Sequence, residues 1–215
     1  GLNQQTKPEK LNDWEAGIER KSNKTFLSAD FYYMKYKDQL VLTGKINDVG
    51  SYTRTNIPDS YRLGVELQGG AVINQYLKAS ANLTLSRNKI LNFTEYIDDY
   101  DNGGQKMNQY SESDISFSPS VIGGATISVI PVQKLSIDFL SKFVSKQYLD
   151  NTNNEARKLN SYFTEDARVI YSFSKNRLKN VDLVIQVNNI FNKQYEANGY
   201  TYSYYYNTQL ITENF

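Results

Sequence analysis

The chain has 215 residues, and its 24 basic and 23 acidic side chains leave a net charge of +1. That balance gives no electrostatic footprint for nucleic acid, which is therefore not an expected partner. The chain also contains no cysteine and no histidine, which excludes disulfide scaffolds, thiol nucleophiles, the usual zinc ligand and every Ser-His-Asp triad. We therefore expect no enzyme: no catalytic residues, no metal site and no cofactor.

Alternation of apolar and polar residues dominates the chain, which is the period of a half-buried β-strand, and helical periodicity is nearly absent. The clearest case is 77–86, where Leu and Ala at odd positions oppose Lys, Ser, Asn and Thr at even positions. Eight segments follow the pattern, in chain order 14–19, 27–34, 63–68, 77–86, 120–129, 134–143, 166–173 and 181–188. The sequence thus predicts an all-β fold, an antiparallel meander of about eight long strands.

The connections between these segments alternate between short and long. The short ones are 21–24, 69–75, 130–134 and 174–180, and the long ones are 43–60, 96–113, 150–160 and the tail from Asn198. The long connections are polar and rich in Asn, Asp, Gly and Tyr. Hairpins that are short at one end of a sheet and long at the other are typical of a transmembrane β-barrel.

Strand length favours the same fold. The segments 25–42, 77–94 and 133–149 each exceed the roughly 9–11 residues that cross a bilayer, and the strands of large transporters commonly project past the membrane. The sequence contains no stretch of about 18 apolar residues, so no transmembrane helix is expected. No signal peptide is recognisable. Because the chain begins with Gly rather than Met, we treat it as a piece of a longer protein.

A bilayer explains the alternation, because one face of a spanning sheet meets lipid, the other meets the lumen, and every backbone group must pair within the protein. The lipid-facing set of the clearest strand is then Leu77, Ala79, Ala81, Leu83 and Leu85. Tyrosines gather where strands enter the long connections, as expected of an aromatic girdle at the membrane interface. They are Tyr32, Tyr33, Tyr36, Tyr96, Tyr100, Tyr148, Tyr195, Tyr200 and Tyr202.

Four motifs make the chain resemble the C-terminal part of the barrel of TonB-dependent outer-membrane receptors of the Bacteroidetes type. "KPEKLNDWEAGIER" (7–20) is similar to a strand entry of that family, and "SYRLGVELQGG" (60–70) to a later strand. The hairpin from "DISFSPS" to "QYLDNT" (114–152) and "LVIQVNNIFNKQYEANGYTY" (183–202) follow in the family's order. The resemblance covers nearly the whole chain.

This resemblance implies a 22-stranded transmembrane β-barrel in the cell outer membrane, closed around an N-terminal plug. It implies active uptake of a nutrient such as a siderophore, cobalamin or an oligosaccharide, driven by TonB through the plug. Outer-membrane lipids and the transported small-molecule or glycan ligand are then the partners, and a surface lipoprotein is left open. Residues 1–215 form a single segment of such a barrel, which lacks the plug and the final strand and supplies wall and extracellular loops.

Two groups of loop residues are weak candidates for binding the ligand. They are Tyr96, Asp98, Asp99, Tyr100 and Asp101 in one connection, and Tyr200, Tyr202 and Tyr204 in the tail. Tyrosine rings could stack on a sugar or a siderophore, although girdle or loop packing explains them equally well. The three carboxylates suit Ca²⁺ chemically, but the EF-hand spacing is absent, and a solvated loop is the simpler interpretation.

Two alternatives to a receptor stay open at this point. A soluble antiparallel sandwich also has one apolar face per sheet, so the chain could be a secreted all-β glycan-binding module or a surface adhesin. Extraction separates them, because a barrel protein needs detergent and a secreted module does not.

Overall fold

The computed structural model describes residues 6–46, 49, 51–175 and 178–215, and this part of the chain consists of strands, turns and extended segments without a helix. No membrane-crossing helix is found among the described residues. The strands are β1 (Lys10–Lys21), β2 (Thr25–Ile46), β3 (Tyr52–Asn74), β4 (Leu77–Asp99), β5 (Gln105–Asp114), β6 (Val121–Val132), β7 (Leu135–Val144), β8 (Gln147–Tyr148), β9 (Lys158–Leu159), β10 (Tyr162–Lys175), β11 (Leu178–Val187), β12 (Thr201–Tyr206) and β13 (Gln209–Asn214).

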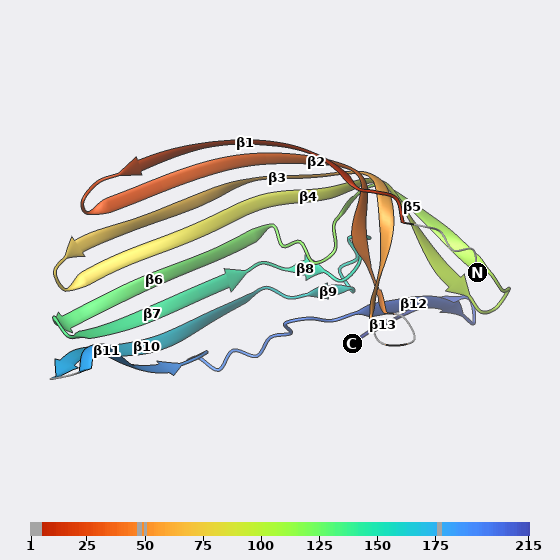
Figure 1. Ribbon diagram of the computed structural model, residues 1–215. Coiled ribbons are helices and arrows are strands. Elements are labelled where there is room, and N and C mark those ends of the chain that lie inside the picture. The colour runs from red at the N-terminus through yellow and green to blue at the C-terminus, as the bar shows by residue number, and fades with distance from the viewer. Residues whose placement is uncertain (1–5, 47–48, 50, 176–177) are drawn as a thin grey trace.

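Eight of these strands follow one another across a single sheet in the order β1-β2-β3-β4-β6-β7-β10-β11, each antiparallel to its neighbour. Each contains, to within one residue at the segment's ends, one of the eight segments predicted from the sequence, so the antiparallel meander is confirmed. β5 pairs with the second half of β4, whereas β6 pairs with its first half. Figure 1 shows the eight strands running side by side, with β8 and β9 as a small separate pair.

The pairing register gathers the apolar positions of successive strands on one face. One row across β1 to β4 consists of Ile18, Ala29, Leu67 and Leu83. The adjacent row, on the other face, consists of Glu19, Ser28, Gln68 and Asn82. Since side chains alternate between faces along a strand, the register confirms the predicted alternation as a property of the whole sheet.

The apolar face of the sheet is uncovered within the described part of the chain. Ile18 is 74% exposed and Ile185 is 61% exposed, although both are large hydrophobic residues. The buried hydrophobic residues lie elsewhere, and the cluster that packs together is Val41, Ile57, Ile90 and Ile115. An apolar face of this extent marks a surface that meets something other than water.

Three predicted loops are largely strand. β2 and β3 have 22 and 23 residues and β4 has 23, which at about 3.3 Å per residue gives lengths of about 70 Å or more. Most of the predicted connection 43–60 therefore belongs to β2 and β3, apart from residues 47, 48 and 50, which lie outside the described part. Likewise 96–113 belongs mainly to β4 and β5, and the tail contains β12 and β13. These extensions lack the alternation of the wall, although some of their apolar residues, such as Ile57 and Ile97, are buried.

The predicted long strand 133–149 was wrong, because the observed strand is shorter. β7 ends at Val144, and the chain leaves the sheet after Ser145, whose N–H still donates to the carbonyl of Val121. Gln147 and Tyr148 then pair with Leu159 and Lys158 instead of extending β7.

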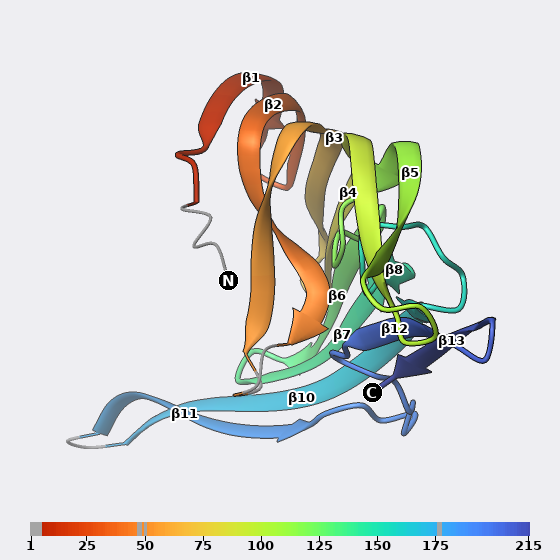
Figure 2. The same ribbon diagram turned by 90° about the vertical axis from the view of Figure 1, so that its right-hand side faces the viewer.

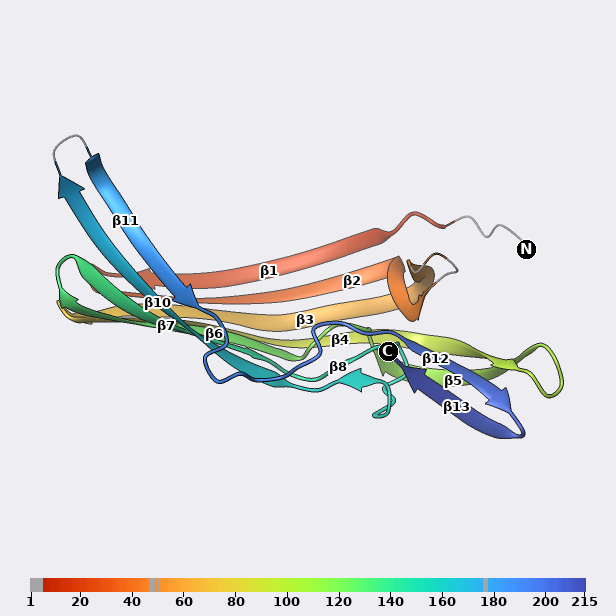
Figure 3. The same cartoon turned by 90° about the horizontal axis from the view of Figure 1, so that it is seen from below.

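The two ends of the sheet differ as predicted, with short turns at one end and long excursions at the other. Residues 22–24, 75–76 and 133–134 make the short turns, and the fourth, predicted at 174–180, includes residues outside the described part. Figure 2 shows the eight strands following a curve, so that the sheet forms an open trough. Figure 3 shows the turns gathered at one end and β5, β12 and β13 at the other.

At the long end the excursions fold against one another into a lobe, which we define as residues 38–43, 53–60, 88–120, 145–160 and 198–215. Asn151, fully buried, joins three of its segments. Its side chain accepts a hydrogen bond from the Ser116 N–H (2.8 Å) and donates one to the Leu42 carbonyl (2.7 Å). The lobe thus has its own polar and apolar interior.

Candidate functional site

The two candidate segments from the sequence lie side by side at the end of the lobe. β12 runs parallel to the end of β4, with Tyr204 opposite Asp98 and Tyr205 opposite Asp99. The Tyr100 N–H donates to the Tyr205 carbonyl at 3.0 Å. A backbone ladder therefore joins residues that are more than 100 positions apart in the sequence.

Four of the eight candidate residues form one cluster, which we call the tyrosine cluster: Asp98, Tyr100, Tyr202 and Tyr204. Tyr202 donates to the Asp98 carboxylate at 3.0 Å and shares a 2.5 Å hydrogen bond with Tyr100. The Tyr204 ring lies 5.4 Å from that of Tyr100 and 5.5 Å from that of Tyr202. The hydrogen bond with Tyr100, together with burial and the Asp98 carboxylate, raises the pKa of the Tyr202 phenol.

The other two acidic candidates bind the protein itself. Asp101 accepts hydrogen bonds from the N–H groups of Asn207 (2.8 Å) and Thr208 (2.7 Å), in the turn between β12 and β13. Both turn residues have positive φ, 49° and 62°, so the carboxylate holds an unfavourable backbone conformation.

Asp99 pairs with Lys106 at 3.2 Å and accepts from the side chain of Asn102 at 3.1 Å. The three carboxylates thus face different partners, and the described residues contain no cluster of acidic side chains arranged for a metal ion.

The two remaining candidates lie apart from the tyrosine cluster. Tyr200 stacks on Phe215, with ring centroids 5.1 Å apart. Tyr96 lines a cavity inside the lobe together with Glu95 and Arg157. The structure therefore brings four of the eight predicted residues together and places the other four with separate partners.

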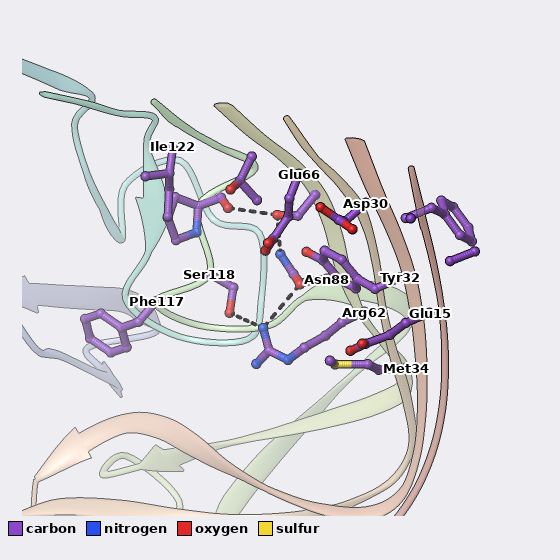
Figure 4. A pocket seen from close by; sticks show the side chains of 16 residues that line it. Glu15, Asp30, Tyr32, Met34, Arg62, Glu66, Asn88, Phe117, Ser118 and Ile122 are labelled. Carbon is purple, nitrogen blue, oxygen red and sulfur yellow. Dashed lines mark hydrogen bonds between the residues drawn. The ribbon is translucent and has the colours of Figure 1, made fainter. Parts of the chain in front are cut away.

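A larger cavity, of about 640 Å³, lies on the polar, concave face of β1 to β4 (Figure 4). Its walls include Glu15, Asp30 and Glu66, which alternate along their strands with the apolar residues of the other face. Segment 115–120, which returns from β5 to β6, closes one side with Ser118. The cavity is therefore open to the trough and mainly acidic.

Arg62 is the cation of this cavity. Its guanidinium donates through Nη1 to Asn88 Oδ1 at 3.2 Å and to Ser118 Oγ at 3.1 Å. Figure 4 shows Arg62, Asn88 and Ser118 directed toward one another, with Tyr32 beside them. Tyr32 lies across Gly64, where an added Cβ would come within 2.5 Å of the phenol oxygen. Glycine is thus required there for this arrangement.

None of the residues around Arg62 was identified as a site from the sequence, where they were only the polar half of an alternating pattern. The signal was a charged residue at a position that the pattern directs into the trough. A lumen-facing charge needs no special function, so the pattern alone could not distinguish this cavity from the rest of the polar face.

Comparison with known proteins shows the family and the fold. Residues 1–190 match the family described as TonB dependent receptor-like, beta-barrel. No curated protein matches the chain.

Several solved structures similar to the chain are receptors or transporters. The ferric yersiniabactin uptake receptor FyuA from Yersinia pestis has 18% identity and a TM-score of 0.61, covering 96% of this chain and 28% of FyuA. The copper transporter OprC has 18% identity and a TM-score of 0.64, covering 89% and 26%. The ferric-catecholate import receptor Fiu from E. coli K12 has 18% identity and a TM-score of 0.59, covering 88% and 24%. The chain therefore spans about a quarter of the length of these proteins.

Proposed function

Because this chain belongs to the family of TonB-dependent receptor-like β-barrels, we propose that it is part of the wall of an outer-membrane active transporter for a nutrient. The order of its four motifs supports a C-terminal portion of a Bacteroidetes-type receptor with 22 strands. In this proposal a plug domain outside residues 1–215 contacts TonB, and this chain supplies barrel wall and extracellular loops. It carries out no catalysis.

The observation that carries the proposal is the uncovered apolar face of the eight-strand wall. Within the described residues every inner strand of the wall pairs on both sides, and the edges of the wall are β1 and β11. Hydrocarbon tolerates such a surface because no unpaired backbone group meets it, whereas water does not favour it. We expect the two edges to pair with the remaining strands of the barrel, since open edges do not occur in lipid.

For the ligand we propose a small molecule captured at the lobe, which lies at the long-loop end and would face the outside of the cell. The solved relatives carry ferric yersiniabactin, ferric catecholates and copper, which makes an iron chelate the first class to test. Cobalamin and oligosaccharides fit the same wall. A surface lipoprotein that covers the lobe is a further partner consistent with this placement.

Membrane partition of the purified chain tests the proposal. We expect residues 1–215 to require detergent, and to float with phosphatidylethanolamine–phosphatidylglycerol liposomes on a density gradient after refolding. A folded monomer in detergent-free buffer that stays at the bottom of the gradient would overturn the wall assignment. That result would favour a secreted glycan-binding module or an adhesin.

A further inference from the structure

The lobe encloses a cavity of about 250 Å³ that is separate from the acidic cavity of the trough. Its walls come from β2, β3, β4, β12 and the segment between β8 and β9. At roughly 30 Å³ per water molecule it has room for about eight waters. Because pockets for drug-sized ligands measure roughly 300–1,000 Å³, its occupant would be smaller, about one ring with its substituents.

A buried guanidinium forms one wall. Arg157 is 2% exposed, and its Nη1 bridges the carboxylates of Glu95 and Asp150. Glu95 also accepts from the Tyr110 hydroxyl at 3.0 Å, and Asp150 accepts from the Thr152 hydroxyl at 2.6 Å. The Nε–H of Arg157 is buried and has no acceptor in the described part of the chain. An unpaired buried donor is unfavourable, and a small rotation toward a ligand oxygen would pair it.

Hydroxyl groups form most of the remaining wall. Thr201 and Ser203 point inward from β12, 3% and 5% exposed, while Tyr202 between them points the other way. Their hydroxyls bond to β13, that of Thr201 to the Glu213 carbonyl at 3.3 Å and that of Ser203 to the Thr212 hydroxyl at 3.0 Å. Thr55 and Thr94 also line the cavity, and their hydroxyls make no hydrogen bond within the described residues. Tyr96 adds an aromatic surface at the edge.

These walls limit the chemistry of an occupant. An anion would meet Glu95 and Asp150, and a cation would meet Arg157, so neither charge is favoured. A purely apolar molecule would leave the hydroxyls of Thr55 and Thr94 and the Nε–H of Arg157 without a partner. We infer that the lobe cavity binds a small neutral molecule rich in hydroxyl groups, of the size of a single sugar ring. The inference rests on the proposed function, because ligand capture at the lobe is its purpose.

Calorimetric titration tests the cavity directly, with D-glucose added to residues 1–215 folded in detergent micelles. We expect saturable binding at one site, and much weaker binding of citrate and of 1,4-diaminobutane. Thr94→Val removes a free hydroxyl without changing the side-chain shape and should lower the association constant about tenfold, the equivalent of one hydrogen bond. Thr84→Val is the matched control, because Thr84 lies on the same strand but lines the cavity of the trough, and its binding should equal that of the unchanged chain.

Arg157→Lys is a second variant, since lysine keeps a positive charge for Glu95 and Asp150 but has no equivalent of Nε–H. Binding should be lost while the melting temperature stays within the range of folded variants. If this variant unfolds, the comparison of Thr94→Val with Thr84→Val decides alone. Absence of saturable glucose binding, equal affinity in the two threonine variants, or preference for citrate or diaminobutane would each overturn the inference.

The cavity assignment and the wall assignment can be disproved separately. A chain that floats with liposomes but binds no glucose would disprove the cavity assignment and leave the transporter proposal intact. A chain that binds glucose with the expected threonine dependence, yet stays in aqueous buffer without lipid, would disprove the wall and retain the cavity.

Discussion

The wall of eight strands and the lobe are built on different principles. In the wall, apolar and polar side chains mostly alternate, and large residues such as Ile18 and Ile185 remain mostly exposed. In the lobe, alternation is weak, but Val41, Ile57, Ile90 and Ile115 are buried together and a polar network surrounds Asn151 and Arg157. The lobe is stabilised by its own interior, whereas the wall depends on its surroundings for burial.

Because of this difference, substitutions of polar and of apolar residues should affect different regions of the molecule. Polar network residues should control the lobe, because buried ion pairs and hydrogen bonds are costly to break. Outward apolar residues should control the wall only when lipid is present. Three substitutions and one titration test this difference between the wall and the lobe.

Arg157→Leu should destabilise the lobe by about 3–5 kcal/mol, because it leaves Glu95 and Asp150 as buried carboxylates without their cation. Native-state hydrogen exchange in micelles measures this, with the loss confined to amides of the lobe. Lys146→Leu is the control, since Lys146 pairs with Glu155 at the surface, and exposed pairs contribute little. Equal loss of protection in the two variants would contradict the contrast.

Ile127→Arg should lower stability in liposomes by about 2–4 kcal/mol, the range found for Arg at the bilayer midplane. Thr126→Arg, one residue earlier on β6, places the same charge on the concave face and should change little. Urea titration of refolded chains, followed by tryptophan fluorescence, gives both values. If the order of the two variants is reversed, the face assignment is wrong.

Asn151→Ala should destabilise the lobe by about 1–3 kcal/mol, because the Ser116 N–H and the Leu42 carbonyl lose their buried partner. Asn154 is a control three residues away, where the side chain only caps the Ala156 N–H at an exposed turn. The Ser116 amide should exchange faster in Asn151→Ala, whereas its exchange rate should not change in the control, Asn154→Ala. An unchanged rate at Ser116 would rule out the proposed role of Asn151.

Tyr110 should titrate late. Burial, followed by the Glu95 carboxylate, raises the pKa of Tyr110 from 10.0 to about 12. Since the protonated phenol is favoured in the folded state, its stabilising contribution is complete below pH 10 and is lost as the pH rises through 12. The difference in ultraviolet absorbance between the unchanged chain and Tyr110→Phe should therefore show a transition near 12, and Glu95→Gln should lower it. A transition near 10 would place Tyr110 in solvent.

The wall could be predicted from the sequence because its signal is local. The alternation from Leu77 to Leu85 indicates which face of the sheet each side chain lies on. Strand pairing then places the apolar residues of the neighbouring strands on the same face. The lobe strands β5 and β12 carry no aliphatic alternation, and backbone pairing holds them, β5 against β4 and β12 mainly against β13. Their existence as strands was therefore missed.

The candidate site was predictable by residue type but not by arrangement. Tyr202 and Asp98 were both chosen from the sequence, and they do meet, but through a parallel pairing that no local pattern encodes. Thr201 and Ser203 were passed over because a short hydroxyl beside a row of tyrosines gives no signal of its own. Arg157 was missed for a similar reason, since its burial arises only when the segment from Leu149 folds against β4.

The parallel pairing of β12 with β4 has a consequence for the order of folding. Closing a flexible loop of about 100 residues costs roughly 4 kcal/mol in chain entropy, and contacts of such long range form slowly. If β6, β7, β10 and β11 are already in place, much of that separation is bridged by structure and the remaining search is short. Residues 201–206 should therefore dock last, so that the lobe closes only over a wall that has been assembled correctly.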